Sequence, residues 1–279
     1  MFCEASLVTR CNMRIVGVIL FFVLTLIPAG AQWLHYPTAG VPRLPGGAAN
    51  LGAPAPRTQG GVPDLSGIWI AEENRPCPPY NCDDMLTPQE FWDIGWSLKG
   101  GVPYQPWVNA LIKQRGETHG MGDPTARCLP GGIVKTYTDP LLRKVVQVPG
   151  LLIILTERNT SYRQIFTDGR PLPEDPQPSA NGYSSGTWEG DTLVVRTSGF
   201  QDGIWLDRKG SPLTEAGTLT ERFRRVNYGK LNIDLTVDDP NAYTAPWTVT
   251  LHQNLKPDTD LVDYVCLENE KDQRHFVGK

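Results

Sequence analysis

Apolar and polar residues alternate with a period of two along the C-terminal half of the chain, from Arg143 onward. This period is typical of strands that bury one face, and the apolar runs are separated by turn residues. The predicted strands cover residues 144–148, 151–157, 162–167, 186–189, 192–197, 218–226, 231–238, 248–252 and 261–267. The predicted turns are Pro149-Gly150, Asp168-Gly169, Gly190-Asp191 and Tyr228-Gly229. Many short strands at such spacing predict an antiparallel β-barrel or β-sandwich.

One further strand and two helices are predicted ahead of this region. The strand covers Leu65–Ile70. Thr87-Pro88-Gln89-Glu90 has the residues of a helix start, with threonine as the N-cap and glutamate completing a capping box. An apolar face follows from Phe91 to Trp96, and a second helix is predicted over about Gln105–Lys113. The fold class is therefore mainly β, with a two-helix insertion at about residues 84–130, after the first strand.

The first 31 residues have the features of a cleaved export signal. Two arginines precede an apolar run over residues 15–27, and the small residues Ala29 and Ala31 fit a signal-peptidase site. The run is shorter than the roughly 20 residues that span a bilayer, which favours cleavage over an uncleaved anchor. Met1 and Met13 are both candidate translation starts. The sequence thus predicts a secreted or periplasmic protein with no stable membrane span after cleavage.

Residues 32–63 are rich in glycine, proline and alanine and show no apolar periodicity. Such a segment is a tether or an extended arm, either disordered or docked on the body of the protein. The remaining residues, 64–279, are predicted to form a single β-rich domain that includes the helical insertion.

The cysteines support an oxidising compartment. Of six in total, Cys3 and Cys11 lie in the predicted signal, which leaves Cys77, Cys82, Cys128 and Cys266. An even number in an exported chain predicts two disulfides. We favour Cys77–Cys82, which closes a short loop, and Cys128–Cys266, whose long loop gives the larger stabilisation in the entropic model. The alternative is a zinc site made of all four, although their spacing lacks paired Cys-x-x-Cys motifs.

Charge and motifs restrict the partners. The chain has a net charge of −4, which disfavours nucleic acid as a partner. Its four histidines are scattered, and it has no GxGxxG sequence or P-loop, so neither a metal site nor a cofactor is predicted. A small molecule remains as the expected ligand.

Strand alternation places one carboxylate on the inward face of a predicted strand, since Glu221 lies between Leu219 and Phe223 on the same face. A buried carboxylate must be paired or protonated. The candidate partners are Arg163, Arg170 and Arg225. Two interpretations stay open, namely an ion pair that stabilises the barrel and a catalytic acid or base.

Two predicted turns carry further charged candidates. Asp168 and Arg170 form either a plain turn or an arginine held to receive an acidic group of a ligand. Glu189 and Asp191 are either a solvated hairpin tip or a catalytic acid/base pair.

Five segments resemble the signatures of a family of secreted bacterial proteins of unknown function. They are Asp64-Leu-Ser-Gly-Ile-Trp69, Phe166-Thr-Asp-Gly-Arg170, Trp188-Glu-Gly-Asp-Thr-Leu-Val-Val195, Thr220-Glu-Arg-Phe-Arg-Arg225 and Tyr264-Val-Cys266. Relatives often carry histidine at the positions of Tyr183 or Thr187 and near Leu213, where this chain has none. The Gly67-Ile68-Trp69 strand also resembles, more weakly, the opening strand of calycin barrels such as lipocalins.

Three functions fit these features. The first is binding of a small, largely apolar ligand in a barrel or cleft, lined by Tyr183 and Trp188 and anchored by the charged residues above. The second is a cofactor-free hydratase, isomerase or cyclase that uses Glu221 with an arginine partner. The third is a cell-surface interaction or structural protein. A closed cavity favours the first two functions, and a solid core favours the third.

Overall fold

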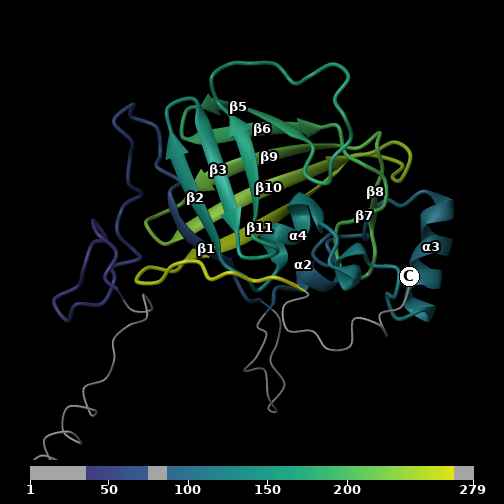
Figure 1. The fold of residues 1–279 in the computed structure, drawn as a ribbon, viewed down its shortest axis with the longest axis horizontal. Helices are drawn as coiled ribbons and strands as arrows, with labels where there is room; N and C mark the ends of the chain where they lie inside the picture. Colours follow the sequence, from purple (N-terminus) through teal and green to yellow (C-terminus); the bar gives the residue numbers. More distant parts are fainter. Residues whose placement is uncertain (1–35, 75–86, 267–279) are drawn as a thin grey trace, which may run out of the picture. The chain divides into compact units, whose positions relative to one another are not determined.

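The computed structural model describes residues 36–74 and 87–266. From Pro37 onward, the described residues belong to one compact unit, built on a closed β-barrel (Figure 1). Around the barrel the strands follow the order β1-β11-β10-β9-β6-β5-β4-β3-β2. They are β1 (Gly67–Ala71), β2 (Arg143–Val148), β3 (Leu151–Thr156), β4 (Ser161–Phe166), β5 (Tyr183–Glu189), β6 (Thr192–Ser198), β9 (Thr218–Arg225), β10 (Lys230–Asp238) and β11 (Trp247–Leu255). The predicted β-rich fold with a helical insertion is confirmed, in its barrel form.

Neighbouring strands around the barrel run antiparallel, with one exception. Strands β4 and β5 run parallel and share only two register pairs, Ile165 with Ser184 and Phe166 with Ser185. Strands β3 and β4, by comparison, share six register pairs. The long connection over residues 167–182 causes this parallel junction, because it brings the chain back to begin β5 beside the end of β4. We call the junction the β4–β5 seam.

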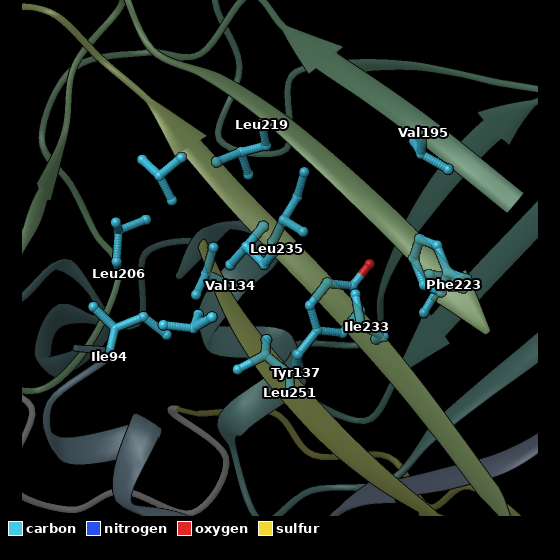
Figure 2. Packing of buried hydrophobic residues seen from close by; sticks show 14 of the residues in the cluster. Ile94, Val134, Tyr137, Val195, Leu206, Leu219, Phe223, Ile233, Leu235 and Leu251 are labelled. Atoms are coloured by element: carbon cyan, nitrogen blue, oxygen red, sulfur yellow. The ribbon is translucent and has the colours of Figure 1, made fainter. Parts of the chain in front are cut away.

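Alternating side chains fill the barrel interior. On β9, Leu219, Glu221 and Phe223 are buried, as the alternation predicts, and Arg222 is exposed. Figure 2 shows Phe223 with Ile233 and other buried side chains of the cluster. The Gly190-Asp191 turn is also confirmed, because Glu189 pairs with Thr192 and Gly190 has a φ of 59°.

The segment between β1 and β2 is more extensive than predicted. It contains α2 (Gln89–Trp92), α3 (Pro106–Glu117), a 3₁₀ helix η1 (Pro124–Arg127) and α4 (Gly132–Thr138). Two short strands later in the chain, β7 (Ile204–Trp205) and β8 (Pro212–Leu213), pair only with each other. None of the helices in the described ranges has the length and apolar character of a membrane-spanning helix.

Helix α2 corrects the prediction for residues 87–96. Pro88 occupies the N-cap position without a side-chain cap, and the Thr87 hydroxyl instead accepts from the Trp92 indole at 3.1 Å. The helix ends after one turn because the next amides bind elsewhere. The amide of Ile94 donates to the buried Asp207 carboxylate at 2.8 Å, so a tertiary contact replaces the helical hydrogen bond.

Helix α4, which was not predicted, lies against β1 and β11 at one end of the barrel. Its Tyr137 is buried, and the ring meets Phe223 edge to face with centroids 6.1 Å apart. Figure 2 shows Tyr137 among the same buried side chains as Ile233 and Phe223. The helix therefore supplies a polar group to the barrel interior.

Residues 37–63, which we call the arm, lie beside the opposite end of the barrel (Figure 1). Leu51 and Ala53 accept hydrogen bonds from the β9–β10 turn at 2.9 and 2.8 Å. Arg43 pairs with Asp258 at 2.5 Å. The described part of the predicted tether is thus an arm docked on the barrel.

A disulfide joins Cys128 to Cys266, which confirms one of the two predicted pairs. The other, Cys77 with Cys82, lies outside the described residues. The predicted strand over residues 261–267 is wrong in its described part, where Tyr264 makes only an isolated bridge with Arg158. The barrel is already closed by β1 between β2 and β11, so it leaves no free edge for another strand.

Candidate functional site

The barrel end that carries the β2–β3 and β5–β6 turns opens into a cavity of about 420 Å³, which we call the mouth cavity. Its described lining consists of Thr58, Gln59, Gly60, Val62, Gln147, Val148, Pro149, Gly150, Leu152, Thr167, Trp188 and Leu193. Leu152 and Leu193 are buried core residues, so the apolar barrel interior borders this cavity. Trp188 is a predicted ligand-binding residue, and the sequence did not single out the other lining positions.

The arm segment Arg57–Pro63 forms one wall of the mouth cavity. It is a small loop closed by hydrogen bonds from Thr58 to Val62 and from Gly61 back to Thr58, at 2.9 and 3.0 Å. The Arg57 guanidinium donates to the Gly61 carbonyl at 2.6 Å, which fixes the loop from within. We call this segment the arm loop.

One ion pair joins the arm loop to the barrel. Arg57 donates to both carboxylate oxygens of Asp191, at 2.9 and 2.6 Å, and Asp191 lies in the β5–β6 turn. These hydrogen bonds hold the pKa of the Asp191 carboxyl below its ordinary value. Both side chains are more than half exposed, so the pair contributes little stability. Asp191, predicted either as half of an acid/base pair or as part of a solvated hairpin tip, thus binds Arg57 of the arm loop.

Protein groups already bind the main polar side chains of the mouth cavity. The Gln147 amide accepts from the Leu65 main chain at 2.7 Å and donates to the Pro63 carbonyl at 3.2 Å. The Thr58 hydroxyl donates to the Val62 carbonyl at 3.3 Å. A molecule in this cavity would therefore meet mostly apolar surface.

A second cavity, of about 660 Å³, lies at the β4–β5 seam. Its lining includes three predicted ligand-binding residues, Arg163, Arg170 and Tyr183. Arg170 pairs with Asp168 at 2.6 Å and lies 3.8 Å over the Phe166 ring, so its charge is largely engaged. The hydrogen bonds from Arg170 hold the pKa of Asp168 below its ordinary value. We call this the seam cavity.

Glu221 lies at the centre of a buried cluster behind the seam. The Arg163 guanidinium donates to both its oxygens, at 2.8 and 2.5 Å, and the Tyr137 hydroxyl donates to Oε1 at 2.7 Å. Arg163 also donates to the Ser184 and Thr197 hydroxyls, at 3.0 and 2.9 Å. We call these five residues the Glu221 cluster. Among the predicted partners of Glu221, Arg163 is therefore the one that the fold supplies.

The Glu221 cluster ties the seam together. Its residues come from α4, β4, β5, β6 and β9, so its hydrogen bonds cross the junction at which β4 and β5 share only two register pairs. Glu221 is fully buried and lines neither cavity. This arrangement fits a group that stabilises the barrel wall.

Electrostatics keep Arg163 charged and Tyr137 neutral. Burial alone would lower the pKa of Arg163, but the Glu221 carboxylate outweighs it and holds that pKa above the ordinary value. Burial, together with the same carboxylate, holds the pKa of Tyr137 well above its ordinary value. Tyr137 thus stays a neutral donor beside an arginine cation.

The remaining predicted residues are apart from both cavities. Arg225 donates to the main-chain carbonyls of Ser66 and Tyr228, at 3.2 and 2.5 Å, and lies 5.0 Å from the Trp69 ring. Burial lowers the pKa of Arg225 to about 10. Glu189 of β5 pairs with Arg222 of β9 at 3.0 Å, whereas Asp191 pairs with Arg57.

Sequence reasoning missed Tyr137 and the buried ion pair of Asp123 and Lys135. In this pair, the ammonium lies 2.7 Å from each carboxylate oxygen, which fixes α4 against the preceding loop. Burial lowers the pKa of Lys135 despite the neighbouring carboxylate. Lys135 and Tyr137 both belong to α4, which starts at a Gly131-Gly132 pair. This helix has seven residues and is too short to give a periodic signal.

No protein-family model, curated protein or solved structure matches this chain. In the described part of the chain, no group of three His, Cys, Asp or Glu side chains is arranged to hold a metal ion.

Proposed function

We propose that this protein binds a small, largely apolar ligand in the mouth cavity of its barrel. The observation that carries the proposal is the mouth cavity itself, about 420 Å³ in volume, bordered by the apolar interior and covered on one side by the arm loop. Sites for small molecules have volumes of roughly 300–1,000 Å³ and mainly apolar walls. In this proposal Trp188 provides the aromatic wall.

The barrel interior is filled by side chains, so the mouth cavity at the barrel end is the feature that favours ligand binding over a purely structural role. The enzymatic alternative has less support. A catalytic acid or base must reach its substrate, to within about 3 Å or through one water. Both oxygens of Glu221 accept hydrogen bonds from Arg163, and the side chain has no exposed surface.

We also propose, from the sequence, that the protein is exported and acts outside the cytoplasm.

Filling the mouth cavity should abolish ligand binding without unfolding the protein. Val148 lines the cavity and is 45 % exposed, so Val148→Trp adds volume there without overpacking the core. We expect Val148→Trp to weaken binding of the neutral fluorophore N-phenyl-1-naphthylamine at least ten-fold in an equilibrium titration. Its free energy of unfolding should stay within about 1 kcal/mol of the wild type, as for most exposed substitutions.

Val226→Trp is the matched control. Val226 is 50 % exposed, lies just beyond β9 and does not line the mouth cavity. It should bind the fluorophore as the wild type does. Equal loss of binding in both variants, or no saturable binding to the wild type, would refute the proposal.

A further inference from the structure

The mouth cavity is lined by uncharged groups. Every described residue of its lining is neutral at pH 7, whereas the seam cavity includes Arg163, Arg170 and Glu174. An ionised ligand group in the mouth cavity would lose part of its hydration without gaining a counter-ion. The chemistry of the lining therefore selects against charged ligands.

The arm loop covers the mouth cavity and has few attachments to the barrel beneath it. Its own hydrogen bonds, from Thr58 to Val62 and from Gly61 to Thr58, are internal to the loop. The hydrogen bond from Gln147 to the Pro63 carbonyl and the ion pair of Arg57 with Asp191 join the loop to the barrel. The Asp64 amide donates to the Pro56 carbonyl at 2.9 Å, so main-chain pairing holds the two ends of the loop together, and the Gln147 contact lies at this base. The Arg57 guanidinium, which also binds the Gly61 carbonyl, joins the rest of the loop to Asp191.

We propose that the mouth cavity takes an uncharged ligand and that the arm loop is its lid, latched by the Arg57–Asp191 ion pair. This inference rests on the proposed function and adds the ligand's charge and its route of entry. An exposed ion pair is weak, so the latch opens readily. The rates of ligand binding and release then depend on the fraction of molecules in which the arm loop is open. The pair is also sensitive to salt, which links exchange to ionic strength.

The turn that carries the latch also provides a matched control. Asp191→Asn removes the charge that Arg57 binds, and asparagine is well tolerated in a hairpin turn. Glu189→Gln breaks the ion pair with Arg222, which is similarly exposed and joins two barrel strands, β5 and β9. The two substitutions lie two residues apart and remove one charge each.

The lid is tested by stopped-flow kinetics with N-phenyl-1-naphthylamine. We expect Asp191→Asn to raise the association and dissociation rates by the same factor, up to about five-fold, with little change in the dissociation constant. Glu189→Gln should leave both rates unchanged. Unchanged rates in Asp191→Asn, or equal acceleration in both variants, would overturn the lid.

Two further measurements separate this inference from the proposed function. Because Asp191 holds the Arg57 guanidinium that also fixes the Gly61 carbonyl, amide hydrogen exchange of the ligand-free protein at Thr58 and Gly61 should be faster in Asp191→Asn than in the wild type or Glu189→Gln. This expectation holds whether or not a ligand binds. If exchange there is the same in both variants, the latch is wrong even where the fluorophore binds.

The charge of the ligand is tested with 8-anilinonaphthalene-1-sulfonate, which has the same ring skeleton and one negative charge. We expect it to compete for the mouth cavity at least ten-fold more weakly than the neutral fluorophore. Competition at equal concentrations in the wild type, together with loss of direct 8-anilinonaphthalene-1-sulfonate binding in Val148→Trp, would show that the cavity accepts anions and would contradict the assignment.

Discussion

Glu221→Gln should lower the free energy of unfolding by roughly 3–5 kcal/mol, the usual effect of removing one partner from a buried ion pair. Glutamine keeps the shape of the side chain but leaves the Arg163 cation without its counter-charge. Arg163 is 7 % exposed, so water cannot replace the lost carboxylate. Urea unfolding at pH 7, monitored by tryptophan fluorescence, measures the change.

The control is Glu189→Gln, which breaks an ion pair in which the Glu189 side chain is 57 % exposed. It should cost less than about 1 kcal/mol. In addition, Arg163→Met combined with Glu221→Leu should be more stable than Glu221→Gln alone, because neither charge is left buried. A change below 1 kcal/mol for Glu221→Gln would show that the Glu221 cluster does not hold the seam.

Replacing both Cys128 and Cys266 by serine should lower the free energy of unfolding by about 2–5 kcal/mol. The disulfide joins positions 138 residues apart, and the entropic model gives long loops the larger effect. It also holds the segment after β11 to the loop before α4, and Asn159 of the β3–β4 turn accepts from the Cys266 amide at 3.4 Å. Denaturant unfolding of the double variant measures the loss.

A control for this prediction uses the wild-type protein in reducing buffer. Reduction should lower its stability by at least as much as the double substitution does, because both remove the same cross-link. The double variant should still show the circular dichroism of a β-rich protein. A double variant as stable as the oxidised wild type would exclude a stabilising role for the disulfide.

The barrel could be predicted where alternation and turns are unambiguous. In β9 and β10, apolar and polar residues alternate strictly, so the inward face of Glu221 follows from the sequence. In β3 the run Leu-Leu-Ile-Ile-Leu is apolar at every position, so the pattern does not say which residues face inward. The structure buries Leu152 and Ile154.

The sequence restricts the ion-pair partner of Glu221 to a few arginines but does not identify which of them forms the pair. Three arginines were candidates, and the choice of Arg163 depends on the parallel β4–β5 seam, which no local signal predicts. The position of Tyr137 in the cluster depends on α4, a short helix that starts at two glycines. The mouth cavity depends on the arm, whose glycine- and proline-rich sequence has no period that would place it on the barrel.

The most direct test of ligand binding in the mouth cavity is photo-cross-linking with a small, neutral, apolar diazirine, followed by peptide mapping. We expect saturable labelling of residues 58–62 and 147–150, displaced by N-phenyl-1-naphthylamine and lost in Val148→Trp. Displaceable labelling of residues 170–174 in the seam cavity, with none at the mouth cavity, would contradict it.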